Sequence, residues 1–162
     1  MFKKLIIVLT VFYLLLTGST TLQAANKYNI LIVKSEYLLE LREGDQVVRS
    51  YKVGLGKNPG QKMRIGDLTT PTGDDFYIEE IIDSSRWTHD FKDGKGEITG
   101  AYGPWFLSLE TPWDGIGIHG THKPESIGMM DSEGCVRMYN QDVEELKQLV
   151  DIGTKVIIKE KR

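Results

Sequence analysis

Cys135 is the only cysteine in the 162-residue chain, so it cannot form a disulfide within the chain. It follows a glycine in the segment Ser132-Glu133-Gly134-Cys135-Val136-Arg137-Met138. A free thiol has a pKa of about 8.5, and a nearby cation lowers that pKa so that the nucleophilic thiolate forms near neutral pH. His119 and Arg137 are the cations in reach. A buried cysteine that only fills space is the alternative interpretation.

His119 lies in the run Gly115-Ile116-Gly117-Ile118-His119-Gly120, which we interpret as a strand. A strand alternates its side chains between two faces, so Ile116 and Ile118 share one face while Gly117 and His119 share the other. The isoleucines are expected to face the core. We therefore predict that His119 faces a cleft beside Gly117, although a lone histidine is usually structural.

His119 and Cys135 are separated by 16 residues, and Pro124 and Gly128 mark a loop that could return the chain to the histidine. Imidazole would then take the thiol proton as a general base. Gly134 permits unusual backbone geometry, so the N–H groups of Gly134 and Cys135 form a candidate oxyanion hole. This spacing alone does not identify a family.

Most of the remaining chain reads as short strands. Apolar or alternating runs predict strands at Ile30–Val33, Val47–Val53, Phe76–Ile82, Trp105–Leu109 and Val156–Ile158. A turn at Glu43–Gln46 predicts that the run containing Leu39 and Leu41 forms a hairpin with Val47–Val53.

Two glycine-rich stretches, Gly54–Gly73 and Asp83–Gly100, read as loops, and the second is expected to be mobile and to roof the site. One helix is predicted near the C-terminus, capped by Asn140 and ending before Gly153. Its apolar face comprises Val143, Leu146, Leu149 and Val150. The fold class is therefore mainly β, with one short helix.

The N-terminus has the layout of a secretory signal, which we assign to residues 1–25. Lys3 and Lys4 precede a 12-residue apolar run, Leu5–Leu16, and the small residues Ala24 and Ala25 follow. A membrane-spanning helix needs about 20 apolar residues, so membrane contact is expected to be transient, through this segment. The net charge of −3 does not favour nucleic-acid binding. Export to the periplasm or cell wall is expected.

Several motifs form a specific set. They are His119-Gly120-Thr121, Ser126-Ile127-Gly128, Ser132-x-Gly134-Cys135-Val136-Arg137-Met138, and, upstream, Thr70-Pro71-Thr72-Gly73 followed by Phe76. The set resembles the L,D-transpeptidase catalytic domain family of the YkuD type. The resemblance implies one catalytic domain over residues 28–160, with a β-sandwich or mixed sheet, and it implies no cofactor or metal.

The resemblance also implies an activity. In that family a cysteine attacks the carbonyl before the terminal D-alanine of a peptidoglycan tetrapeptide stem and forms a thioester. An amine of a second stem then takes the acyl group, and in some members the acceptor is an envelope protein's lysine or water. Carried over, Cys135 is the nucleophile, His119 the base, and the Gly120 carbonyl orients the imidazole. The implied substrate and oxyanion residues are Gly134, Arg137, Ser132, Tyr102 and Trp105.

The chain departs from this pattern at Glu133, where many family members carry histidine before the Gly-Cys pair. A carboxylate there opposes thiolate formation unless Arg137 offsets it. Three alternatives remain: an L,D-carboxypeptidase that trims stems, a non-catalytic peptidoglycan-binding module, and a zinc enzyme using His119, His122 and Cys135. Residues three apart on a strand face opposite ways, which disfavours zinc.

Overall fold

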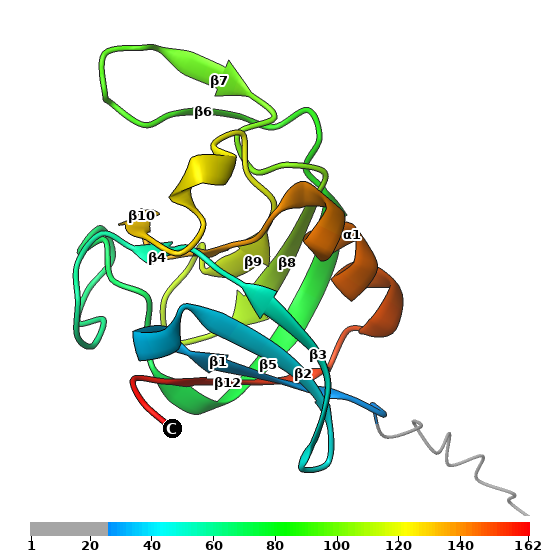
Figure 1. Cartoon of the computed structure of the whole chain (residues 1–162). Coiled ribbons are helices and arrows are strands. Elements are labelled where there is room, and N and C mark those ends of the chain that lie inside the picture. Colours follow the sequence, from blue (N-terminus) through cyan, green and yellow to red (C-terminus); the bar gives the residue numbers. More distant parts are fainter. Residues whose placement is uncertain (1–25) are drawn as a thin grey trace, which may run out of the picture.

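The computed structural model describes residues 26–162 (Figure 1). The predicted secretory signal, residues 1–25, lies outside the described residues. Within residues 26–162, no helix is both long and apolar enough to cross a membrane. The predicted fold class is confirmed, because the described chain consists mainly of strands with a single α-helix.

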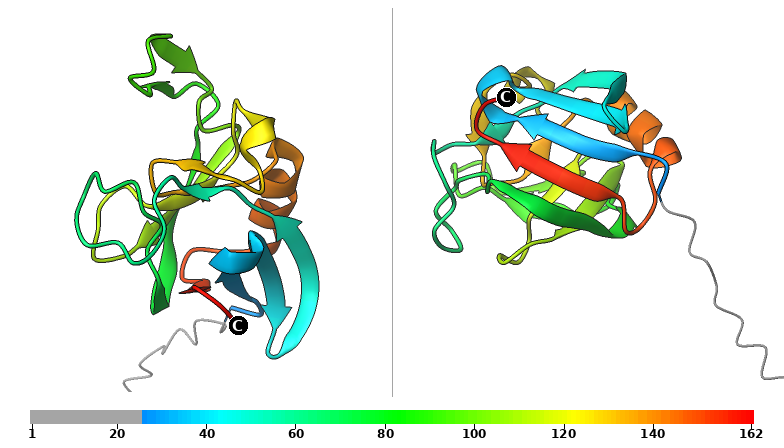
Figure 2. Two further views of the ribbon diagram at one scale, coloured as in Figure 1. Left: turned by 60° about the vertical axis from the view of Figure 1, so that its left-hand side comes forward. Right: turned by 90° about the horizontal axis from the view of Figure 1, so that it is seen from below.

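Eight strands form one curled, mixed sheet. In spatial order they are β11 (Val136–Arg137), β9 (Gly117–His119), β8 (Trp105–Glu110), β5 (Gly73–Asp83), β12 (Lys155–Lys159), β1 (Asn29–Val33), β2 (Leu38–Glu43) and β3 (Gln46–Lys52). The pairs β1–β12 and β9–β11 are parallel, and the others are antiparallel. The sheet curls around its own apolar face, so the predicted strands share one core (Figure 2).

Strand periodicity explains this core. The inward residues of β1 and β2 include Ile30, Ile32, Leu39 and Leu41, all with 0% of their surface exposed. Their partners across the sheet are equally apolar. Burying such side chains removes apolar surface from water, which stabilises the folded chain by roughly 25 cal/mol for each Å² buried. The hairpin predicted around the Glu43–Gln46 turn is confirmed, since β2 and β3 pair antiparallel.

The helix α1 (Asn140–Leu149) packs on β8 and β9. It buries Val143 and Leu146 from the predicted apolar face. The predicted cap at Asn140 is wrong: Tyr139 is the N-cap residue and its side chain makes no capping hydrogen bond. Asn140 is instead the first helical residue, and its Oδ1 accepts a hydrogen bond from the Thr121 N–H at 2.8 Å.

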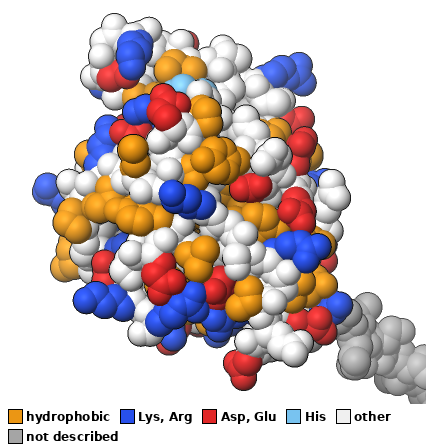
Figure 3. Space-filling model, viewed as in Figure 1, with side chains coloured by type: hydrophobic (Ala, Val, Ile, Leu, Met, Phe, Trp, Pro, Cys, Tyr) orange, Lys and Arg blue, Asp and Glu red, His pale blue; other side chains and the backbone are white. Residues whose placement is uncertain are grey.

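Two small sheets and two short 3-10 helices complete the described chain. β4 (Leu55–Gly56), which lies in the first predicted loop Gly54–Gly73, pairs with β10 (Met130–Ser132). The 3-10 helices are η1 (Lys34–Glu36) and η2 (Pro124–Ser126). The predicted loop Asp83–Gly100 contains a hairpin of β6 (Thr88–Asp90) and β7 (Glu97–Thr99). This hairpin projects from the sheet at the top of the molecule (Figure 1), and Figure 3 shows basic and acidic side chains on the surface of this projection.

The parallel pairing of β9 with β11 positions the motif residues. Its register joins Ile118 to Val136 and His119 to Arg137. The segment between these strands therefore returns the chain to the histidine strand, as the sequence predicted. Cys135, one residue before β11, is thereby brought to the β9–β11 edge of the sheet, where His119 also lies.

Candidate active site

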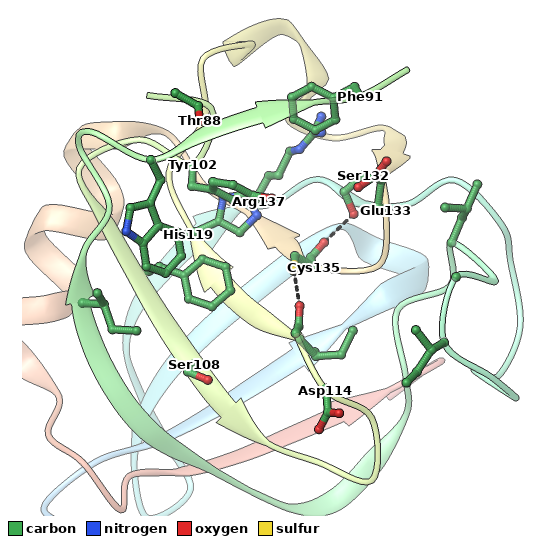
Figure 4. Close-up of a pocket in the computed structure, with 18 of the residues that line it drawn as sticks. Thr88, Phe91, Tyr102, Ser108, Asp114, His119, Ser132, Glu133, Cys135 and Arg137 are labelled. Atoms are coloured by element: carbon green, nitrogen blue, oxygen red, sulfur yellow. Dashed lines mark hydrogen bonds between the residues drawn. The ribbon is translucent and has the colours of Figure 1, made fainter. Parts of the chain in front are cut away.

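A cavity of about 940 Å³ opens beside the β9–β11 edge of the sheet, and both residues of the predicted catalytic pair, His119 and Cys135, line it. His119 and Cys135 both line it, and Figure 4 shows their side chains directed into the same space. The loop after β4 contributes Lys62 and Leu68, and the hairpin end contributes Phe91. The site thus combines β9, the segment before β11, one long loop and the hairpin.

Cys135 precedes β11 and is half-buried. Its thiol donates to the Gly115 carbonyl, with Sγ and O 3.2 Å apart. Burial raises the pKa of the Cys135 thiol to about 11; the Gly117 N–H and Arg137 lower it in part, and Glu133 raises it further. The opposing effects that the sequence predicted for Arg137 and Glu133 are both present, but burial outweighs them.

His119 ends β9 and is 3% exposed. Its Nδ1 lies 2.5 Å from the Gly120 carbonyl oxygen. A carbonyl oxygen only accepts, so Nδ1 carries the proton and Nε2 holds the free lone pair. Phe106 stacks on the imidazole at 5.3 Å between centroids, and Tyr102 meets it edge-on at 5.0 Å. The ring is therefore fixed in both tautomer and orientation.

The resting pair is neutral. Burial lowers the pKa of His119 to about 3, a change that the Gly120 carbonyl only partly opposes. With the pKa of the Cys135 thiol near 11, proton transfer from sulfur to imidazole is unfavourable before substrate binds. Burial therefore favours the neutral pair over the predicted thiolate and imidazolium, because both charged forms lose solvation in this site. A neutral imidazole still suits a general base that acts during attack.

The Gly120 carbonyl is held in place by helix α1. The bond from the Thr121 N–H to Asn140 Oδ1 fixes the backbone just after Gly120. A Cβ at Gly120 would collide with Asn140 Oδ1 and Pro104, so glycine is required for this approach. Sequence reasoning noticed Asn140 only as a helix cap. Its contact with the histidine segment depends on tertiary packing that periodicity does not reveal.

Gly117 has a different role from the one predicted. It was expected to leave open space beside His119, but a Cβ there would collide with the Phe106 ring. The missing side chain therefore admits Phe106, which stacks on the histidine. Ile118 is 0% and Ile116 is 3% exposed, in agreement with the predicted core face.

Ser132 organises the turn before the nucleophile. Its hydroxyl accepts from the Gly134 N–H at 3.1 Å. The hydroxyl also donates to the Cys135 carbonyl at 2.6 Å, the bond drawn between Ser132 and Cys135 in Figure 4. The Gly134 N–H is therefore already engaged, and the predicted oxyanion hole reduces to the Cys135 N–H. Gly134 has φ +131°, and a Cβ there would lie 3.0 Å from the Thr69 carbonyl oxygen. Glycine is needed here for its conformation.

Arg137 lines the cavity but is 3% exposed. Its Nη1 lies 3.0 Å from Asp131 Oδ2, which also pairs with Lys123 at 2.9 Å. The Phe91 ring covers the guanidinium, with 5.5 Å between its Cζ and the ring centroid. Arg137 is thus a paired, buried cation that the hairpin covers.

Of the two aromatic residues predicted for the substrate cleft, Tyr102 lines the cavity and Trp105 does not. Tyr102 lines the cavity, and burial raises its pKa to about 12, so its hydroxyl stays protonated at neutral pH. Trp105 is not among the residues that line the cavity; its ring packs beneath Lys147 of α1, with Nζ 4.4 Å from the centroid. On β8, Phe106 and Ser108 face the cavity, so Trp105 faces the other way.

Sequence reasoning missed the contact between the hairpin and the nucleophile segment. His89 Nε2 lies 2.9 Å from Glu133 Oε2, although 44 residues separate them. His89 was expected at the surface, and 29% of its side chain is exposed. Its ring also contacts Phe91 at 4.5 Å and Tyr102 at 5.6 Å. Nothing in the local sequence around His89 indicates this partner.

His122, the third residue of the zinc alternative, is not among the residues that line the cavity shared by His119 and Cys135. Its Nδ1 lies 3.1 Å from the Ala101 carbonyl oxygen, and its ring packs against Phe91. Within residues 26–162, no group of three histidine, cysteine, aspartate or glutamate side chains is placed to hold a metal ion. The described side chains therefore give no support to that alternative.

Known proteins are similar to this chain in sequence. The YkuD protein of Bacillus subtilis (strain 168), assigned by name to the L,D-transpeptidases, is 36% identical over 131 residues, which are 81% of this chain and 65% of that protein. The chain thus spans just under two thirds of that relative. The YkuD protein of Bacillus licheniformis is 34% identical over the same shares.

Solved structures with lower identity share the fold. L,D-transpeptidase 3 from Mycobacterium tuberculosis, in complex with a faropenem-derived adduct, has a TM-score of 0.62 at 17% identity, covering 83% of this chain and 60% of that one. The helical cell shape determining protein Pgp2 from Campylobacter jejuni has a TM-score of 0.61 at 24% identity, covering 86% and 49%. The family model for the YkuD L,D-transpeptidase catalytic domain matches residues 27–158. This chain therefore belongs to the L,D-transpeptidase catalytic domain family.

Proposed function

We propose that this protein is an exported acyltransferase that uses Cys135 to transfer a peptidoglycan tetrapeptide stem to an amine. The observation that carries the proposal is the parallel pairing of β9 with β11, which brings the free Nε2 side of His119 and the Cys135 thiol to one cavity. Membership of the L,D-transpeptidase family supplies the substrate class. The cavity volume of about 940 Å³ lies at the upper end of the range for ligand sites, which leaves room for the end of a stem peptide.

The first half-reaction forms a thioester. His119 Nε2 removes the Cys135 proton as sulfur attacks the carbonyl before the terminal D-alanine, and the Cys135 N–H hydrogen-bonds the developing oxyanion. The proton then passes from Nε2 to the departing nitrogen, and D-alanine leaves. The neutral resting pair fits this sequence, because the imidazole is unprotonated when the thiol must lose its proton.

The second half-reaction reverses these roles. An amine attacks the thioester, His119 Nε2 takes a proton from its nitrogen, and the sulfur departs and recovers that proton. The product contains a new amide bond, and the free enzyme is restored. Tyr102, whose hydroxyl remains a donor, is proposed to contact the stem at the cavity wall together with Arg137.

Product analysis tests the proposal against its alternatives. The purified protein is incubated with a disaccharide-tetrapeptide, and the products are identified by mass. Cross-linked dimers with released D-alanine are expected from the unaltered protein and are absent with Cys135→Ala. Disaccharide-tripeptide without dimers would instead show a carboxypeptidase. No reaction, together with retained binding of the stem, would show a peptidoglycan-binding module.

A further inference from the structure

The carboxylate of Glu133 stands beside the proposed nucleophile without a permanent cationic partner. It lies two residues before Cys135, lines the same cavity, and keeps 41% of its side chain exposed. Its charge raises the pKa of the Cys135 thiol, so it hinders thiolate formation. Because the Glu133 carboxylate hinders the first half-reaction, a role for it is sought in the second half-reaction.

Two of the cations that line the cavity are paired with other carboxylates. Arg137 pairs with Asp131 at 3.0 Å, and Lys62 pairs with Asp67 at 2.7 Å. The contact to Glu133 comes from His89, whose Nε2 bonds Oε2 at 2.9 Å. This bond holds one carboxylate oxygen and leaves Oε1 for another donor.

The second half-reaction presents such a donor. A lysine-like side chain has a pKa of about 10.4, so an amine acceptor enters the cavity as ammonium at neutral pH. An ammonium cannot attack a thioester until it loses a proton. His119 Nε2 takes the proton that leaves the nitrogen during attack, so the proton that the ammonium must lose before attack needs a second acceptor. A carboxylate near Cys135 can both bind the ammonium and accept its proton.

We propose that Glu133 binds the ammonium group of the acyl acceptor and takes its first proton, which favours amines over water as acceptors. The inference rests on the proposed acyl transfer. The ammonium gives one proton to the Glu133 carboxylate and becomes a neutral amine. That amine attacks the thioester, its second proton goes to His119 Nε2 and then to the departing sulfur, and Glu133 returns its proton to solvent, directly or through His89.

The test separates the two half-reactions with Glu133→Gln. The glutamine side chain keeps the size of Glu133 and a bond to His89, but it loses the charge. Glu97→Gln, which removes a charge from β7 outside the cavity, is the matched control. Each protein receives tetrapeptide stem whose own side-chain amine is acetylated, so that the stem cannot act as an acceptor. The added acceptor is Nα-acetyl-lysine amide, or hydroxylamine, which is uncharged at neutral pH, or none, in which case water is the acceptor.

At pH 7, Glu133→Gln is expected to lower transfer to the lysine amide roughly 10- to 100-fold, the range for loss of a hydrogen bond to a charged group. D-alanine release without acceptor and transfer to hydroxylamine should stay within about threefold of the unaltered protein, a change smaller than the tenfold that 1.4 kcal/mol produces. The deficit should shrink as pH rises towards 9.5, because more acceptor is then neutral. Glu97→Gln should behave like the unaltered protein.

Two results would overturn the inference: an equal loss with hydroxylamine, or unchanged transfer to the lysine amide in Glu133→Gln. Failure of the unaltered protein to release D-alanine is a separate result. It would overturn the proposed acyl transfer itself and the inference with it.

Discussion

Acid should destabilise this protein through His119, and the effect can be isolated with His119→Gln. The pKa of His119 is about 3 in the folded chain, against 6.5 for an unperturbed histidine. Below pH 6.5 this histidine is protonated in the unfolded chain but remains neutral in the folded chain. The free energy of unfolding therefore falls as pH drops from 6.5 towards 3. Glutamine does not titrate, so the variant lacks this contribution.

The magnitude follows from the two pKa values. At pH 5 an unfolded histidine is almost fully protonated while folded His119 remains neutral. Linkage then gives a loss of about 2 kcal/mol between pH 7.5 and pH 5, at about 1.4 kcal/mol per pH unit below the unfolded pKa. Other titrating groups affect both proteins alike and cancel in the comparison.

Urea unfolding at pH 7.5 and pH 5 measures this difference. The free energy of unfolding should fall by about 2 kcal/mol more in the unaltered protein than in His119→Gln. The absolute stability of the variant does not matter, because only its pH dependence is compared. Equal pH dependences would refute the reasoning: His119 would then bind a proton in the folded state, and a thiolate and imidazolium pair would again be tenable.

Three further predictions concern neighbouring groups. Alkylation of Cys135 by iodoacetamide should keep accelerating beyond pH 9, since the pKa of the thiol is about 11, and a plateau near pH 8.5 would show an unburied thiol. Gly134→Ala should lower the free energy of unfolding by about 1–3 kcal/mol because φ is +131° and the Thr69 carbonyl lies 3.0 Å from the new Cβ; an unchanged urea midpoint would refute this strain. Lys62→Met should lower the urea midpoint because buried Lys62 is replaced and Asp67 loses its ion pair, whereas Lys57→Met, at an exposed position, should leave the midpoint unchanged; equal midpoints for the two variants would refute this.

The sequence predicted the elements that depend on local periodicity. β-branched and alternating runs located the strands around Ile30, Val47 and Val156, because a strand's two-residue period is visible in one short segment. The return of the Cys135 segment to the strand that carries His119 was also predictable. The glycine and proline between them indicated a returning loop, and the motifs supplied the residues.

Features that depend on tertiary contacts were not predictable from the same patterns. Trp105 sits on the strand face opposite the cavity, which only the register with β9 determines. Asn140 bonds Thr121 from a helix that packs across the sheet. The bond between His89 and Glu133 joins segments 44 residues apart through a hairpin with little apolar patterning.

The protonation state of the pair was not predictable from spacing for a related reason. Spacing identifies which ionisable groups meet, but the depth of burial decides which form they adopt. His119 is stacked on Phe106 and 3% exposed, so desolvation outweighs the attraction that a thiolate would provide.

The most direct test of the proposed chemistry is the mass of the enzyme during turnover with a tetrapeptide stem and no added amine. Acid quenching followed by proteolysis and mass spectrometry should show the peptide containing Cys135 increased by the stem minus one D-alanine, with the adduct released by hydroxylamine as a thioester would be. The same peptide from Cys135→Ala should carry no adduct. D-alanine release by the unaltered protein without any adduct on Cys135, or an adduct on another residue, would contradict the proposal.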